Sequence, residues 1–231
     1  MNNLRFFLIV LVVLFMSCSN DVNIDFPGTN FPPGTNNCIL GQGSITSESR
    51  TLANFNSINT TIFAEILLTQ GPLADVVIEG QQNIIDQILT EVVNNELRIT
   101  LNRCVNIAQA VKVHITIPEI SKLTLTGSGD IIAQNDFDLS DLNVTLTGAG
   151  NFNLRGMSTN LDVILTGVGD VNAFDLETDV CDVRITGVGD TEVFVNNELN
   201  VTITGTGSVY YKGSPSITSS ITGVGSVIDA N

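Results

Sequence analysis

The sequence is poor in positive charge: its 231 residues include 9 Lys and Arg against 24 Asp and Glu, which gives a net charge of −15. So acidic a chain cannot neutralise a run of phosphates, and we exclude a nucleic-acid partner. The same shortage argues against electrostatic docking on anionic membranes. Charged residues make up only 14% of the chain and hydrophobic residues 43%, which excludes an intrinsically disordered protein.

Histidine, the most common general base in nucleophilic catalysis, is also scarce, because the chain has only one, His114. His114 alternates with apolar residues over residues 111–117, which places it on the solvent side of a strand. A Ser-His-Asp triad is therefore excluded. We predict that the protein is not an enzyme and needs no cofactor.

The N-terminus has the features of a targeting segment. Residues 6–16 are all apolar, a run shorter than the span of about 20 residues that a membrane helix needs but suited to a signal peptide. The run ends in Phe15-Met16-Ser17-Cys18, which resembles a bacterial lipobox. We interpret residues 1–17 as a lipoprotein signal peptide and Cys18 as an acylated residue that anchors the chain in a bilayer. An ordinary secreted protein with a chance cysteine is the alternative.

The segment after Cys18 looks like a tether. Residues 18–37 are rich in Pro, Asn and Gly and show no helical or strand period. Ser19, instead of Asp, follows the cysteine, which resembles outer-membrane sorting in Gram-negative lipoproteins. We therefore expect a folded domain at residues 38–231, attached to the outer membrane by its lipid. The sequence leaves open whether it faces the cell surface or the periplasm.

The folded domain is built on a repeat. The motif Thr-Gly-x-Gly occurs six times at intervals of 18 to 21 residues, with first glycines at Gly127, Gly148, Gly167, Gly187, Gly205 and Gly223. Strict alternation of apolar and polar residues precedes each motif, and a second short strand follows it. This period predicts an all-β fold, a single-stranded β-solenoid with coils of about 19 residues. The two glycines would turn a corner where a Cβ would clash or φ must be positive.

The region before the repeat is less regular. We predict one helix, at residues 83–93, because apolar residues recur there with helical spacing. Strands are expected at residues 45–52, 55–69, 74–79, 97–101 and 111–117. We interpret this part as earlier, degenerate coils with a cap on the same core.

Three cysteines remain besides Cys18. Cys181 occupies an inward position that Leu or Ile fills in four other coils, so we expect a buried free thiol. This leaves Cys38 and Cys104 to form a disulfide in an oxidising envelope. Neither the number nor the spacing of these residues suits zinc.

Polar side chains stack on the outer side of the repeat. Asp162 and Asp182 occupy the same position in successive coils and could form a paired-carboxylate site. A solvated face is the favoured interpretation, because no base or nucleophile accompanies them. The candidate binding face comprises Asn143, Thr145, Asp162, Asp182, Asn200 and Thr202.

Two further columns invite a ligand hypothesis. Asp130, Asp170 and Asp190 directly follow the second glycine of their motifs, as in calcium-binding solenoids, but Asn or Ser replaces Asp in the other coils. We therefore favour polar turn residues over a metal site. Threonine begins all six motifs; an ice-binding array is one hypothesis, and a hydroxyl ladder that favours β geometry is the preferred one.

The chain resembles the head GIN domain family of auto-transporter adhesins over residues 38–227. The features that carry the resemblance are the lipoprotein signal with Cys18, Gly41-x-Gly43, Phe55-x-x-Ile58, residues 73–80, residues 95–99 and the serial Thr-Gly-x-Gly turns. The resemblance implies a right-handed β-helix on the bacterial envelope with an adhesive role. It supplies no catalytic or binding residues.

Three functions follow, in order of preference. The first is a non-enzymatic binding module that presents a polar face to a glycan or a protein. The second is a structural protein of the envelope that self-associates as a homo-oligomer, because the final coil at residues 221–229 could pair edge to edge. The third is an enzyme acting on polysaccharide through Asp162 and Asp182.

Overall fold

The computed structural model describes residues 38–107 and 109–231. The predicted signal peptide, Cys18 and the tether lie outside the described residues. All buried residues of the described core lie in one compact unit, Asn37–Asn231. Because this unit has a hydrophobic core of its own, we expect residues 37–231 to fold independently. Among the described residues, no helix is long and apolar enough to cross a membrane.

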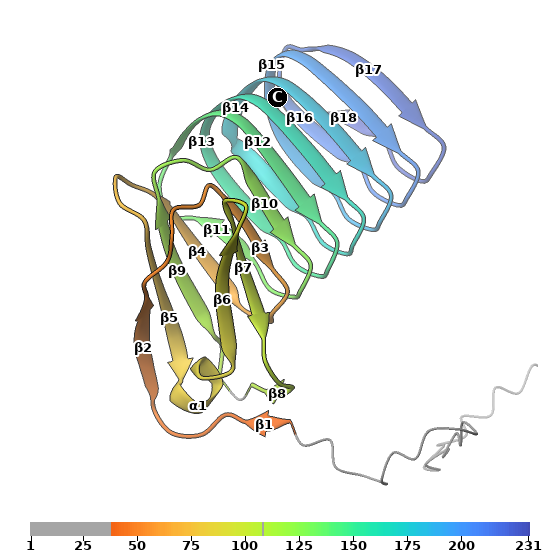
Figure 1. The fold of residues 1–231 in the computed structure, drawn as a ribbon. Coiled ribbons are helices and arrows are strands. Elements are labelled where there is room, and N and C mark those ends of the chain that lie inside the picture. Colours follow the sequence, from red (N-terminus) through yellow and green to blue (C-terminus); the bar gives the residue numbers. More distant parts are fainter. Residues whose placement is uncertain (1–37, 108) are drawn as a thin grey trace, which may run out of the picture. The chain divides into compact units, whose positions relative to one another are not determined.

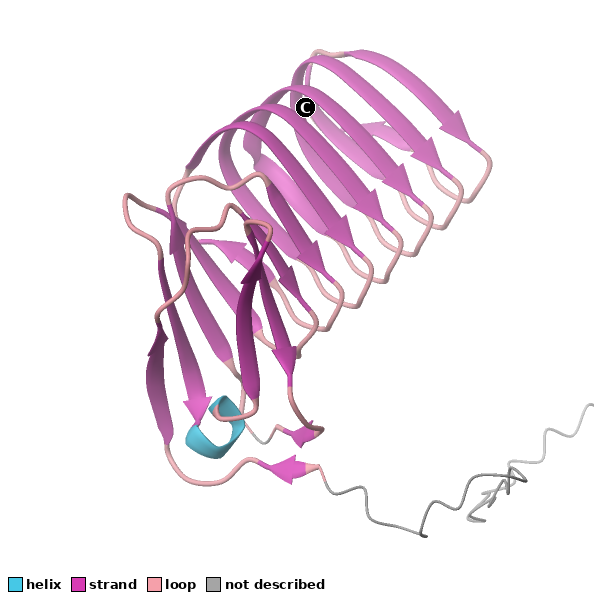
Figure 2. Ribbon diagram, viewed as in Figure 1, coloured by secondary structure: helices cyan, strands magenta, loops and turns pink. Residues whose placement is uncertain are grey.

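Coils of parallel strands form the body of this unit, as Figures 1 and 2 show. Strands that precede the glycine corner make up the first stack. They are β3 (Ser57–Thr60), β10 (Lys122–Leu125), the C-terminal parts of β12 (Phe137–Leu146), β13 (Phe152–Leu165), β14 (Val171–Ile185) and β15 (Thr191–Ile203), and β17 (Ser216–Ile221). The predicted all-β solenoid is confirmed.

Strands that follow the glycine corner make up the second stack. They are β4 (Glu65–Gln70), β11 (Ile131–Ala133), the N-terminal parts of β13, β14 and β15, β16 (Val209–Gly213) and β18 (Val227–Asp229). The inward side chains of both stacks form one hydrophobic core. The alternation in the sequence explains this arrangement, because successive side chains of a strand point to opposite faces.

The corner between the stacks is a ladder of isolated parallel bridges that runs from Phe63 to Val224. A Cβ on Gly150 would overlap the carbonyl oxygen of Gly129 in the preceding coil, and Gly150 has a φ of 144°. The coil that contains Phe63 turns the same corner with Ile62 and Ala64 in place of the glycines. The ladder of bridges begins at this coil, so no corner of a preceding coil packs against residues 62 and 64, and their side chains fit.

The region before the repeat differs in part from the prediction. Its helix is α1 (Gln82–Ile85), much shorter than expected, and the rest of the predicted helix is strand β6 (Ile88–Val93). β6 pairs antiparallel with β7 (Glu96–Leu101), because Asn94 and Asn95 adopt positive φ values of 51° and 63° and form a tight hairpin turn. The prediction missed this turn signal.

Antiparallel strands close the same end. β2 (Ile45–Arg50) pairs with β5 (Asp75–Gln81), and β5 pairs with β9 (Lys112–Ile117), which continues the second stack beside β4. The short strands β1 (Ile39–Leu40) and β8 (Val105–Asn106) pair separately. A disulfide joins Cys38 to Cys104 next to this pair. Cys181 is a free, buried cysteine, and burial raises the pKa of its thiol far above the usual value.

Candidate functional site

The first stack carries the candidate binding face on its outer side. Strand register sets Asn143 beside Asp162, Asp162 beside Asp182, and Asp182 beside Asn200. Thr145 and Thr202 lie in the neighbouring column, with Ile164 and Arg184 between them. The structure thus places all six predicted residues in two adjacent columns of one sheet.

Charge on this face is concentrated at its centre. Asp162 is half-buried, and both this burial and the neighbouring Asp182 raise the pKa of its carboxyl, while Arg184 acts in the opposite direction. The amide of Asn200 donates to Glu198 at 2.8 Å. Hydrogen-bonding groups therefore repeat at the strand spacing of about 4.8 Å on a rigid backbone. Such an array can offer several hydrogen bonds at fixed separations to an extended polar ligand.

The same face extends onto strands that precede the repeat. Lys122 pairs in register with Ser57, and Ser57 with Glu96. The Lys122 ammonium lies 3.7 Å from the Glu96 carboxylate, which also accepts from Arg98 at 3.0 Å. Sequence reasoning missed this extension because β3 and β7 precede the first glycine motif. The alternating polar residues of β3 are the signal that could have revealed it.

The threonine column is longer than predicted. Thr60 pairs with both Leu125 and Ile99, so the next residue, Thr61, stands in line with Thr126 and Thr100. The six repeat threonines are exposed, and the Thr166 hydroxyl donates to the Leu146 carbonyl at 3.2 Å. This contact to the previous coil fits the structural role preferred above.

The column that follows the second glycine is a hydrogen-bond ladder between coils. Asp130 Oδ1 accepts from the backbone N–H of Asn151 at 2.8 Å, and Asn151 Oδ1 accepts from that of Asp170 at 3.0 Å. Asp170 and Asp190 continue the pattern by accepting from the next coil at 2.7 and 2.6 Å. These oxygens satisfy backbone donors, which is the polar turn role expected for them. Among the described residues, no group of three or more His, Cys, Asp or Glu could hold a metal ion.

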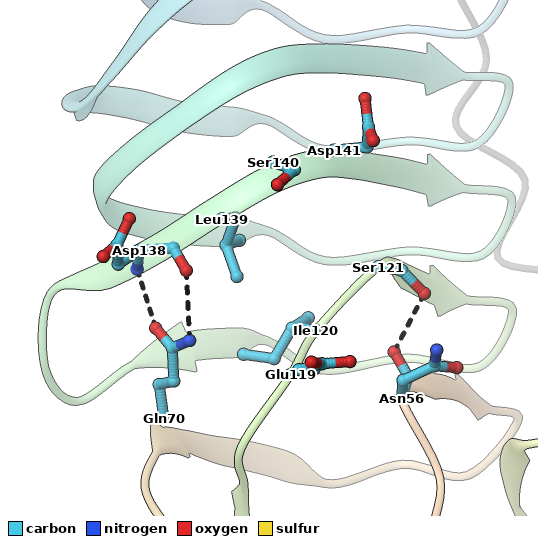
Figure 3. A pocket seen from close by; sticks show the side chains of 9 residues that line it. All are labelled: Asn56, Gln70, Glu119, Ile120, Ser121, Asp138, Leu139, Ser140 and Asp141. Carbon is cyan, nitrogen blue, oxygen red and sulfur yellow. Dashed lines mark hydrogen bonds between the residues drawn. The ribbon is translucent and has the colours of Figure 1, made fainter.

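A pocket of about 290 Å³ lies where the chain enters the first stack, and Figure 3 shows its lining. Gln70 is tied into its wall: its amide donates to the carbonyl of Asp138 at 3.2 Å and accepts from that residue's N–H at 2.7 Å. Ser121 donates to the Asn56 carbonyl at 3.2 Å. Glu119 and Asp141 complete an acidic lining. Its lining mixes polar and apolar side chains, and its three carboxylates belong to Glu119, Asp138 and Asp141.

The comparisons with known proteins agree with the fold. A family model described as "Putative auto-transporter adhesin, head GIN domain" matches residues 54–215. The crystal structure of a putative adhesin from Bacteroides fragilis NCTC 9343 is 25% identical in sequence, with a TM-score of 0.70, and the match covers 83% of this chain and 99% of that chain.

A putative lipid binding protein from Parabacteroides distasonis ATCC 8503 has the same fold at 21% identity and a TM-score of 0.54, over 84% of this chain and 99% of that chain. No curated protein matches this chain.

Proposed function

The chain belongs to the family described as "Putative auto-transporter adhesin, head GIN domain", and from this premise we propose that it is a non-enzymatic adhesive module of the bacterial envelope. Acylated Cys18 anchors it in the outer membrane, and the tether presents the solenoid outside the cell. The binding face made by Asn143, Thr145, Asp162, Asp182, Asn200 and Thr202 contacts a glycan or a protein.

One observation carries this proposal: the six polar residues fall in two adjacent columns of a single sheet. Their backbones are fixed on both sides by neighbouring strands, so little conformational entropy is lost when a ligand binds. The Bacteroides fragilis structure, itself described as a putative adhesin, supports the same role.

Lysine substitution tests the face directly. We expect Asn143→Lys/Asn200→Lys to weaken binding to a glycan or matrix-protein array by about tenfold or more, because two bulky cations replace hydrogen-bonding amides. The matched control is Asn153→Lys/Asn172→Lys, which makes the same charge change in the second stack, where these residues pair in register. Equal binding by both variants would show that the ligand contacts another surface.

The third function considered above, an enzyme acting on polysaccharide, is less well supported. Asp162 and Asp182 are adjacent, yet Asp182 is exposed on an open sheet and their register neighbours are Asn143 and Asn200. A glycosidase needs its two carboxylates on either side of a bound sugar. Self-association has a specific observation in its favour, the exposed apolar end of the solenoid at Ile217 and Ile221.

A further inference from the structure

The C-terminal end of the solenoid leaves its inward residues uncovered by the described part of the chain. β17 pairs only with β15, and β18 only with β16. Ile217 and Ile221 occupy inward positions beside Leu199 and Ile203, which are fully buried. The two isoleucines are 40% and 39% exposed. Figure 1 shows β17 as the last strand of its stack. A free sheet edge with an apolar inner side is a template for another strand.

The opposite end of the solenoid carries charged residues on its edge strands. α1 buries Ile84 and Ile85 against the core. The edge strand β2 carries Glu48 and Arg50, which form an ion pair at 2.9 Å, and the other edge strand, β6, carries Glu91. Charges on edge strands are a common defence against edge-to-edge pairing.

β17 has no such defence. Its sequence, Ser-Ile-Thr-Ser-Ser-Ile, contains no charged residue. The outer column of the binding face ends on β17 at Thr218, which pairs with Asn200. The carboxylates of this column, Asp162 and Asp182, lie on the strands before Asn200, so the edge itself is neutral. In a chain with a net charge of −15, a neutral edge is the place where two copies can approach with least repulsion. The charge pattern therefore favours a second copy of this chain as the occupant.

We propose that two copies of the chain pair antiparallel through β17, about a two-fold axis at Ser219. Across such an axis inward residues face inward residues, so Ile217 lies opposite Ile221 of the second copy, and Ser219 lies opposite itself. This register brings together all four isoleucines of the two edges on the core side. It closes the edge without opening a new one in the first stack, so assembly stops at a dimer.

Pairing is confined to β17 because the other free edge carries a charge. Asp229 lies in β18, and its carboxylate accepts from the N–H and the amide of Asn231 at 3.0 and 2.7 Å. These hydrogen bonds lower the pKa of Asp229, so the carboxylate stays ionised and two β18 edges repel each other.

The dimer joins the outer faces of two first stacks in one continuous sheet. A ligand with repeated epitopes would then meet two copies of the binding face, and the second contact would form at high effective concentration. The pairing itself needs no ligand, so it can be tested separately from the proposed adhesive function.

Sedimentation equilibrium of the residue 37–231 protein over a range of concentrations tests the pairing. We expect a monomer–dimer equilibrium without larger species. Ser219→Lys should weaken dimerisation by about tenfold or more, because it sets two like charges at the axis. Asn172→Lys is the control: it adds the same charge to β14, whose edges are both paired, and should leave the dimer intact.

Cysteine cross-linking tests the register. Oxidation of a mixture of Ile217→Cys and Ile221→Cys proteins should give a mixed disulfide dimer, and neither protein alone should cross-link through the new cysteine. A wild-type protein that stays monomeric throughout, a Ser219→Lys protein that dimerises like wild type, or assembly beyond the dimer would each overturn the proposal.

Discussion

Replacing Gly150 by alanine should destabilise the solenoid by about 5 kcal/mol or more, which approaches the whole stability of a typical domain. The residue has a φ of 144°, and its missing Cβ leaves room for the carbonyl oxygen of Gly129. Alanine would therefore strain its own backbone and push two coils apart where a backbone hydrogen bond from Ala149 to Gly127 joins them. Urea denaturation followed by circular dichroism measures the loss.

The control for this variant is Gly43→Ala. Gly43 also has a positive φ, 88°, but no atom lies within 4 Å of the added Cβ. Only backbone strain of about 1 kcal/mol should appear there. Similar denaturation midpoints for the two variants would show that close packing between coils is not what requires glycine at the corner.

Removal of the disulfide should have the next largest effect. Cys38 and Cys104 are 66 residues apart, and a loop of that length constrains the unfolded chain by about 4 kcal/mol. We expect a Cys38→Ser/Cys104→Ser protein to lose that amount of stability in urea, because no other covalent link holds β1 against β8 in the described residues.

Dithiothreitol provides the control for the disulfide. It should destabilise the wild-type protein to the level of the double serine variant and leave that variant unchanged. An equal midpoint for the oxidised wild type and the double variant would contradict the predicted contribution.

The repeated part of the fold was predictable because each of its signals recurs. Alternation specifies which side chains are buried, and parallel stacking of equivalent positions then places Asp162 beside Asp182. The spacing of the Thr-Gly-x-Gly motifs is enough to predict the two columns of the candidate face, because equivalent positions of successive coils lie side by side. Glycine at the corner is likewise a local requirement that repeats wherever one coil packs on another.

The region before the repeat was less predictable because long-range pairing determines its structure. The spacing of Ile84, Ile85, Ile88 and Leu89 fits a helix, yet all of residues 88–93 pair as a strand with β7. The corner at Phe63 lacks glycine, so its alignment with the repeat, and with it the place of Thr61 in the threonine column, becomes visible only from strand register.

Protease shaving of intact cells tests the central claim most directly, namely that the solenoid is presented outside the cell as an adhesive module. Immunodetection should show loss of residues 37–231 from intact cells while a soluble periplasmic protein survives. Survival of the solenoid until the outer membrane is permeabilised would place it in the periplasm and contradict a surface adhesin.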